Sequence, residues 1–195
     1  NVDVIWQDIL RTDLRGLADQ YNGGRPMKVV ANLPYYVTTP ILLYLLEEKG
    51  CFESITVMVQ KEVADRICAG PGSREYGALS LAVQYYSEPR VVLKVPPACF
   101  LPRPAVESAV LHLKAFSEPP VQADEKQLFA LIRASFNQRR KTLANGLSHG
   151  FSLDGKRLTR EEVEKALAVM GLPADIRGEK LSLEEFAWLS RLLPD

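Results

Sequence analysis

Four consecutive residues, Asn32-Leu33-Pro34-Tyr35, carry groups that could bind a flat base with an exocyclic amine. They follow the apolar residues 29–31, so we expect a strand that ends in a rigid polar loop. In parallel α/β sheets, ligands bind at the carboxyl ends of strands. The loop would therefore lie where such folds carry their chemistry, although four residues of this kind can also form a simple strand-ending turn.

The residue types of this loop suit attack by an adenine amine. That amine is a weak nucleophile because its lone pair is delocalised into the ring. The Asn32 side-chain oxygen and the Leu33 carbonyl could each accept one N–H and free the lone pair, and such groups stabilise charge that develops in a transition state. Pro34 fixes its own φ and has no N–H to compete. Tyr35 could stack on the base, which is worth about 1–3 kcal/mol in nucleic-acid complexes.

The loop and the residues that follow it resemble motif IV of the adenine-N6 methyltransferases. Its sequence is similar to the version of this motif found in the bacterial small-subunit rRNA dimethyladenosine transferases, the KsgA/RsmA family. The similarity covers essentially the whole chain in collinear order. It rests on residues 32–36, 38–40, 59–64, 66, 76–77, 79–80, 95–97, Phe100, Pro102, Pro104, Val106, Ser108, Phe136 and 138–143.

The resemblance implies an enzyme that uses S-adenosylmethionine to dimethylate N6 of adjacent adenines in small-subunit (16S) rRNA during ribosome assembly, without a metal. Phe100 would stack on the base face opposite Tyr35. Asp8 and Asn32 would contact the cofactor, although an Asp that follows a strand is more often a helix cap. Tyr36 departs from the asparagine that is common at its position. The implied catalytic residues are Asn32, Leu33, Pro34, Tyr35 and Phe100.

Basic residues gather in the second half of the chain. Between residues 133 and 160 there is one acid, Asp154, and seven basic residues: Arg133, Arg139, Arg140, Lys141, Lys156, Arg157 and Arg160. Such a cluster can bind phosphate even when the whole chain is neutral, although it can also be a solvated helix face. Under the resemblance, the expected rRNA contacts are Arg139, Arg140 and Lys141, with Lys61, Arg66, Arg74 and Arg103 around the pocket mouth.

Composition excludes several other classes of protein. The 195 residues include 24 basic and 24 acidic side chains, so bulk charge does not drive nucleic-acid binding, and 47% are hydrophobic, enough for a real core. The three cysteines show no pairing pattern, which argues against a disulfide framework or a zinc site. No run approaches the roughly 20 apolar residues of a membrane span. We expect a cytoplasmic protein whose partner is the small ribosomal subunit and whose intact form is a monomer.

Alternating apolar patterns and turn residues predict the elements. The pattern predicts an α/β unit with a mainly parallel sheet in residues 1–117 and a small all-α domain in residues 118–195. The resemblance implies that the first is part of a Rossmann-like methyltransferase sheet and that the second binds rRNA. The last two strands could form an antiparallel pair at the sheet edge. Expected strands cover residues 2–6, 27–31, 54–59, 90–95 and 107–114, and expected helices begin at Thr39, Lys61 and Tyr76. Capping boxes are expected at Asp124, Thr159 and Ser182.

One family feature has no counterpart in this sequence. The family places a glycine-rich cofactor loop after its first strand, whereas Gly23-Gly24 lies in a polar turn before a strand. We therefore expect a fragment that lacks the N-terminal portion and is inactive or nearly so. Two alternatives stay open: an Erm-type large-subunit rRNA adenine methyltransferase and a non-catalytic RNA- or ribosome-binding module. Leu33 and residues 139–143 favour the small-subunit enzyme over the Erm type.

Overall fold

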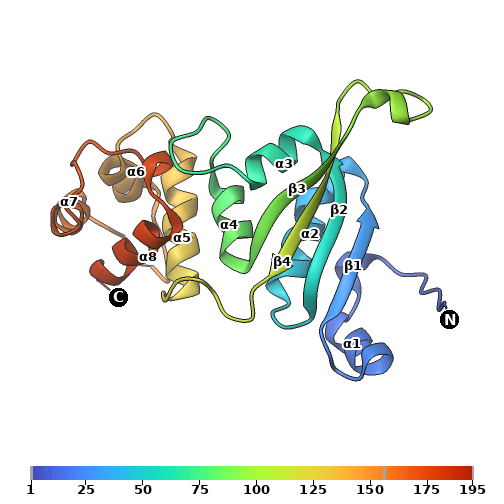
Figure 1. The fold of residues 1–195 in the computed structure, drawn as a ribbon. Coiled ribbons are helices and arrows are strands. Elements are labelled where there is room, and N and C mark those ends of the chain that lie inside the picture. Colours follow the sequence, from blue (N-terminus) through green and yellow to red (C-terminus); the bar gives the residue numbers. More distant parts are fainter. Residues whose placement is uncertain (1, 156, 195) are drawn as a thin grey trace. The chain divides into compact units, whose positions relative to one another are not determined.

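The computed structural model describes residues 2–155 and 157–194, and its contacts divide the chain into two units (Figure 1). The first unit is Asn1–Asp65 with Tyr86–Glu118, and the second is Arg66–Tyr85 with Pro119–Asp195. The predicted boundary after residue 117 lies beside the one at Glu118. Residues 66–85, however, cluster with the second unit, because the buried Tyr76 donates its hydroxyl to the Leu181 carbonyl at 2.8 Å.

The first unit is built on a four-stranded sheet in the order β1-β2-β4-β3. The strands are β1 (Met27–Asn32), β2 (Phe52–Gln60), β3 (Ser87–Val95) and β4 (Ser108–Ala115). Only β1 and β2 pair in parallel, while β4 is antiparallel to both β2 and β3. The antiparallel pairing of the last two strands is confirmed, but the prediction of a mainly parallel sheet is wrong. The connector of residues 96–107 turns the chain back beside β3 and so inserts β4 between β2 and β3.

The predicted strand at residues 2–6 is absent. These residues pair with no described strand, and Trp6 is 99% exposed. They lead into the short helix η1 (Ile9–Arg11) and helix α1 (Leu14–Asn22). The alternating sequence pattern alone was not sufficient, because a strand also needs a neighbour to pair with. The outer edge of β1 is likewise unpaired by any described strand, and its Val30 is 85% exposed.

The core of the first unit lies on one face of β2 and β4. Ile55, Val57 and Val59 alternate along β2 and are fully buried, and their cross-strand partners on β4 are buried as well. Helix α2 (Thr38–Glu47) packs against β2 (Figure 1) through four buried side chains: Ile41, Leu42, Leu45 and Leu46. Each such side chain contributes about 1.5–3 kcal/mol on burial. The helix starts one residue before the predicted Thr39.

The second unit is helical, as predicted. The chain forms α3 (Lys61–Ile67), which begins in the first unit, and then α4 (Ala78–Tyr86), α5 (Glu125–Asn137), α6 (Leu143–Gly150), α7 (Arg160–Val169), η4 (Gly178–Lys180) and α8 (Leu183–Leu192). The capping boxes at Thr159 and Ser182 are both complete. At Asp124 the carboxylate accepts the Gln127 N–H at 2.8 Å, but the Gln127 amide donates to the Pro194 carbonyl instead of returning to the cap.

Aromatic rings and one close backbone approach hold these helices together. The Phe136 ring lies 6.0 Å from that of Tyr76 and 6.3 Å from that of Phe186, measured between centroids. Helix η4 approaches α5 so closely that a Cβ added to Gly178 would lie 2.8 Å from the Cβ of Ser135. Only glycine allows this approach without a shift of the backbone, so η4 is held directly against α5.

Alkaline pH is expected to destabilise the second unit through Tyr85. Burial and the nearby carboxylate of Glu125 raise the pKa of Tyr85 to about 12. The unfolded chain releases the phenol proton near pH 10 whereas the folded chain keeps it, so stability falls as pH rises through this interval. Between pH 9 and pH 11.5 we expect the native protein to lose about 1–2 kcal/mol more free energy of unfolding than Tyr85→Phe.

Urea unfolding followed by circular dichroism at the two pH values measures this difference. Tyr21→Phe is the matched control, because Tyr21 is about half exposed. Equal losses in the native protein and in Tyr85→Phe would contradict the prediction.

Candidate active site and RNA-binding residues

The strand register places two loops at the same end of the strands. Asn32 pairs with Met58 near the carboxyl end of β2, and Gln60 at that end pairs with Ser108 at the start of β4. Ser108 also pairs with Val95, the last residue of β3. The loop that follows β1 and the connector of residues 96–107 therefore leave the sheet at the same end of the strands (Figure 1).

The turn at Pro34 leaves two acceptors without a partner. Pro34 has φ −62° and ψ 131°, and its carbonyl accepts the Val37 N–H at 3.1 Å and the Thr38 hydroxyl at 3.2 Å. No described residue donates a hydrogen bond to the exposed Asn32 side chain or to the Leu33 carbonyl. The turn is thus held by the acceptor that follows Leu33, and the two predicted acceptors stay available to a ligand.

Tyr35 is fixed by a residue that the sequence analysis did not place in the site. Its phenol oxygen lies 2.5 Å from Oγ of Ser108, which is fully buried at the start of β4. The two residues are 73 positions apart, and no local sequence signal connects them. Tyr35 itself is half-buried, whereas the neighbouring Tyr36 is 87% exposed.

Phe100 lies in the connector that leaves the sheet beside Tyr35. It caps the short helix η3 (Pro97–Cys99), where its N–H donates to the Pro97 carbonyl at 3.2 Å, and its side chain is half-buried. The connector extends beyond the strands as an arm (Figure 1). Arg103, in the same connector, is exposed. Tyr35 and Phe100, the candidate stacking residues, thus both lie in segments that leave the sheet at this end of the strands.

Asp8 caps a helix in the structure. Its Oδ1 accepts the Leu10 N–H at 3.0 Å, and its carbonyl accepts the Arg11 N–H and the Thr12 hydroxyl. Tyr44 of α2 donates its hydroxyl to the Thr12 carbonyl at 2.7 Å and so holds this segment against the first unit. The cap thus uses one of the two carboxylate oxygens of Asp8. The contact of Asp8 with a cofactor stays a prediction.

The four RNA contacts that the sequence predicts around the pocket mouth are divided between the two units. Lys61 belongs to the first unit with Arg103, whereas Arg66 and Arg74 belong to the second. Lys61 pairs with Asp65 at 2.9 Å, and this hydrogen bond raises the pKa of the lysine. A solvent-exposed pair of this kind contributes little to stability, because water screens it. Lys61 can therefore exchange Asp65 for a phosphate at little cost.

The three consecutive basic residues have different environments. Arg139 donates through Nη2 to the carbonyls of Arg74 and Tyr76, both at 3.0 Å, and through Nε to Glu179 at 3.3 Å. The side chains of Arg140 and Lys141 are exposed and pair with no described residue. Arg139 therefore anchors a loop and η4, while the next two residues are available for phosphate.

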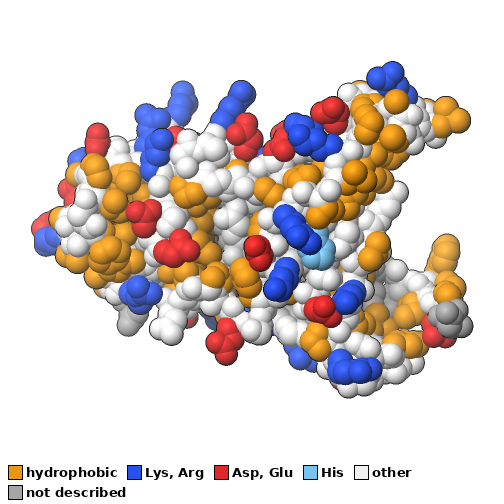
Figure 2. Space-filling view, viewed as in Figure 1, with side chains coloured by type: hydrophobic (Ala, Val, Ile, Leu, Met, Phe, Trp, Pro, Cys, Tyr) orange, Lys and Arg blue, Asp and Glu red, His pale blue; other side chains and the backbone are white. Residues whose placement is uncertain are grey.

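Other members of the basic cluster are dispersed. Arg160 pairs with Glu164 at 2.7 Å, and Arg133 and Arg157 are exposed. Lys156 lies outside the described residues. Figure 2 shows several basic side chains on the upper side of the region that α5–α8 occupy in Figure 1. The exposed members of the cluster can contribute a local positive surface, although the whole chain is neutral.

Alanine at Arg139 and at Arg140 is expected to give different results. Arg140→Ala should weaken binding of a ribosomal RNA hairpin and lower the salt dependence of binding, measured as the slope of log K against log salt, by about 1. Arg139→Ala should instead lower the free energy of unfolding by about 1–2 kcal/mol, because two carbonyls lose a charged donor. Fluorescence anisotropy at several salt concentrations and urea unfolding separate these effects. Identical profiles for the two variants would refute the distinction.

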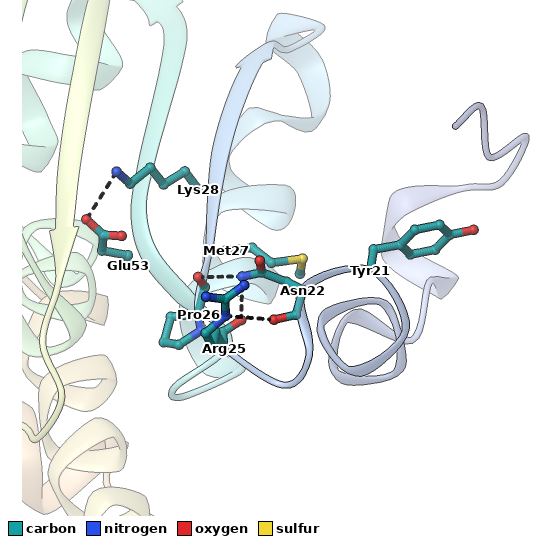
Figure 3. Close-up of a pocket in the computed structure, with 7 residues that line it drawn as sticks. All are labelled: Tyr21, Asn22, Arg25, Pro26, Met27, Lys28 and Glu53. Carbon is teal, nitrogen blue, oxygen red and sulfur yellow. Dashed lines mark hydrogen bonds and ion pairs between the residues drawn. The ribbon is translucent and has the colours of Figure 1, made fainter. Parts of the chain in front are cut away.

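The pocket in Figure 3 lies at the other end of β1. It has a volume of about 770 Å³ and is open to solvent. The Asn22 amide donates to the carbonyls of Arg25 and Pro26 there, and Lys28 pairs with Glu53 at 3.4 Å. β1 rises about 3.3 Å per residue, so its length separates this pocket from the Asn32 loop. The lining residues are Tyr21, Asn22, Arg25, Pro26, Met27, Lys28 and Glu53.

The described part of the chain offers neither a cluster of metal ligands nor a membrane-spanning helix. Within residues 2–155 and 157–194, no group of three His, Cys, Asp or Glu side chains is placed to hold a metal ion. None of the helices in this part of the chain has both the length and the apolar character that crossing a membrane requires.

The chain matches one protein-family model and is similar to several known proteins. The family model for "Ribosomal RNA adenine dimethylase" matches residues 1–176. The ribosomal RNA small subunit methyltransferase A of Lachnoclostridium phytofermentans is 54% identical over 100% of this chain and 67% of its own length. The protein of the same name from Alkaliphilus metalliredigens is 50% identical over 98% of this chain and 66% of its own length. The chain thus spans about two thirds of these relatives.

Two solved structures share the fold. A dimethyladenosine transferase from Plasmodium falciparum superposes with a TM-score of 0.68 at 22% identity, over 83% of this chain and 64% of that one. The 23S rRNA methyltransferase ErmE superposes with a TM-score of 0.63 at 23% identity, over 87% of this chain and 66% of that one. These likenesses support the predicted α/β methyltransferase fold.

Proposed function

The chain belongs to the ribosomal RNA adenine dimethylase family, and from this premise we propose that it carries the target-adenine site of an enzyme that dimethylates adenine N6 in small-subunit rRNA. The observation that supports this most directly is the pair of unengaged acceptors, the Asn32 amide and the Leu33 carbonyl, beside the fixed ring of Tyr35. A flat base with an exocyclic amine matches this set of groups. The assignment also accounts for Phe100 at the same end of the strands.

The residues of the site would activate the amine by accepting its protons. The Asn32 oxygen and the Leu33 carbonyl would each accept one N–H of adenine N6, so the nitrogen becomes more tetrahedral and its lone pair is freed. Pro34 keeps both acceptors in place because its own carbonyl holds the turn. Tyr35 and Phe100 would hold the base after it leaves the helical stack, as base-modifying enzymes require.

The cofactor fits this chain in part. S-adenosylmethionine, when bound, supplies the electrophilic methyl group. Asn32 would lie at the junction of cofactor and target base, and Asp8 would offer its second carboxylate oxygen, since only Oδ1 is used by the cap. No glycine-rich loop follows a strand in the described part of the chain. The residues present therefore suit the adenine end of the cofactor and the target base.

The second unit is proposed to bind rRNA. Arg140 and Lys141 present exposed charges, and Arg66 and Arg74 add to them. Arginine and lysine contacts to phosphate position an RNA without reading its sequence. The proposed binding partner is the small ribosomal subunit. The enzyme would act as a monomer in the reducing cytoplasm.

Methyl transfer from labelled S-adenosylmethionine to small subunits that lack adenine dimethylation tests the proposal. The assay compares this chain, the Lachnoclostridium phytofermentans relative, and a hybrid enzyme in which this chain replaces the matched 67% of that relative. Mass spectrometry of the nucleosides identifies the product. We expect dimethyladenosine from the relative and the hybrid enzyme, and none from the chain alone. An active relative with an inactive hybrid would overturn the proposal, and a hybrid active only on large subunits would indicate an Erm-type enzyme.

A further inference from the structure

A single hydrogen bond joins the Tyr35 loop to the strand that follows the Phe100 connector. We propose that Ser108 is a positioning residue, whose hydroxyl holds the Tyr35 ring in place as one wall of the adenine pocket. The inference rests on the proposed function and adds to it a residue that acts through Tyr35 without touching the substrate.

The hydrogen bond between Tyr35 and Ser108 passes over the end of β2. In the order β1-β2-β4-β3, strand β2 lies between the strand that leads to Tyr35 and the strand that begins at Ser108. Neighbouring strands are about 4.8 Å apart, so the two strands are separated by about 9.6 Å. The loop after β1 and the Tyr35 side chain together cross this separation, and the phenol oxygen ends 2.5 Å from Oγ of Ser108. The contact thus ties β1 to β4, which share no backbone pairing.

The burial of Ser108 makes this partner necessary. Ser108 is fully buried, and buried hydroxyl groups in native proteins are almost always hydrogen-bonded. The phenol is the one side-chain partner of Ser108 in the described structure. Because the hydroxyl of Tyr35 is engaged there, the ring can serve the substrate only through its face. A ring held before binding loses less entropy when the base arrives.

Ser108 also belongs to the frame that carries Phe100. It pairs with Val95 on β3, the connector with Phe100 begins directly after Val95, and it ends directly before Ser108. One wall of the proposed pocket is therefore hydrogen-bonded to the strand that anchors the other. Ser108 thus contacts Tyr35 directly and also directly follows the connector that carries Phe100.

A double-mutant cycle in the hybrid enzyme tests the proposal. Ser108→Ala, Tyr35→Phe and the double variant are compared by single-turnover methyl transfer and by affinity for the RNA. We expect each single variant to lower the transfer rate about 5- to 10-fold, and the double variant to be no slower than either. RNA affinity should change by less than about twofold. Ser108→Thr, which keeps a hydroxyl, should restore most of the rate, and Ser190→Ala, at another buried serine, should leave it unchanged.

Losses that multiply in the double variant would overturn the proposal, because two independent residues give that result. A Ser108→Ala variant that loses stability but keeps its rate per folded molecule would also overturn it, since the serine would then be only structural. A second readout needs no cofactor: the preference of the chain itself for oligoadenylate over oligouridylate, measured by fluorescence anisotropy. Ser108→Ala should lose this preference and Ser108→Thr should keep it, even if the hybrid enzyme proves inactive and the proposed function fails. No preference in the native chain would refute the inference.

Discussion

Replacing Asn32 with alanine should lower the rate of methyl transfer by the hybrid enzyme about 10²- to 10³-fold, the loss that follows removal of one preorganised polar group at a reacting centre. The Asn32 side chain ends β1, is exposed, and is used by no described residue, so its removal costs the fold little. The loss should therefore appear in the transfer step, with RNA affinity close to that of the unsubstituted hybrid. Single-turnover rates and anisotropy titrations measure the two quantities.

Asn22→Ala provides a matched control at the other end of β1. Asn22 is engaged with the carbonyls of Arg25 and Pro26, so this variant should lose stability but keep its transfer rate per folded molecule. Full activity of Asn32→Ala would remove Asn32 from the mechanism. An equal fall in rate and RNA affinity would make it a binding residue.

Replacing Phe186 with alanine should lower the free energy of unfolding of the second unit by about 3–5 kcal/mol. Phe186 is fully buried in α8, and its ring lies beside that of Phe136, which in turn contacts Tyr76. The substitution leaves a cavity next to the Phe136 ring. Urea unfolding followed by helical circular dichroism measures the change.

Trp188→Ala is the control in the same helix. Trp188 is 40% exposed, so its truncation should cost clearly less than that of Phe186. Because Arg140 and Lys141 belong to the same unit as Phe186, Phe186→Ala should also weaken RNA binding at temperatures where this unit is partly unfolded. Similar losses of stability for both variants would show that the aromatic group is not the centre of the core.

Features set by neighbouring residues were predictable from the sequence. The capping boxes at Thr159 and Ser182 depend on side chains three positions apart, and both are complete in the structure. The helical second half followed from apolar spacing and from these caps. The loop at Asn32 was placed at a strand end because β1 is a short apolar run with a proline soon after it.

Features set by distant residues were not predictable in the same way. The insertion of β4 between β2 and β3 depends on which edges meet, which no local pattern encodes. The bond between Tyr35 and Ser108 and the three hydrogen bonds of Arg139 connect residues far apart in the chain. Arg139 has the same residue type as Arg140, yet the structure gives it an anchoring role. Residues 2–6 failed for the opposite reason: the local pattern predicted a strand, but no described strand lies beside them to pair with.

The outer edge of β1 has a consequence for how the chain behaves at high concentration. The backbone N–H and C=O groups of β1 that point away from β2 face no described strand, and Val30 on this strand is exposed on one face of the sheet. Natural proteins often protect such edges with a lysine, but here Lys28 is paired with Glu53, which reduces its repulsive charge. The edge is thus a nucleation point for intermolecular sheets. We expect a charged residue at position 30 to oppose such association, because charges on an edge strand disfavour pairing with another chain.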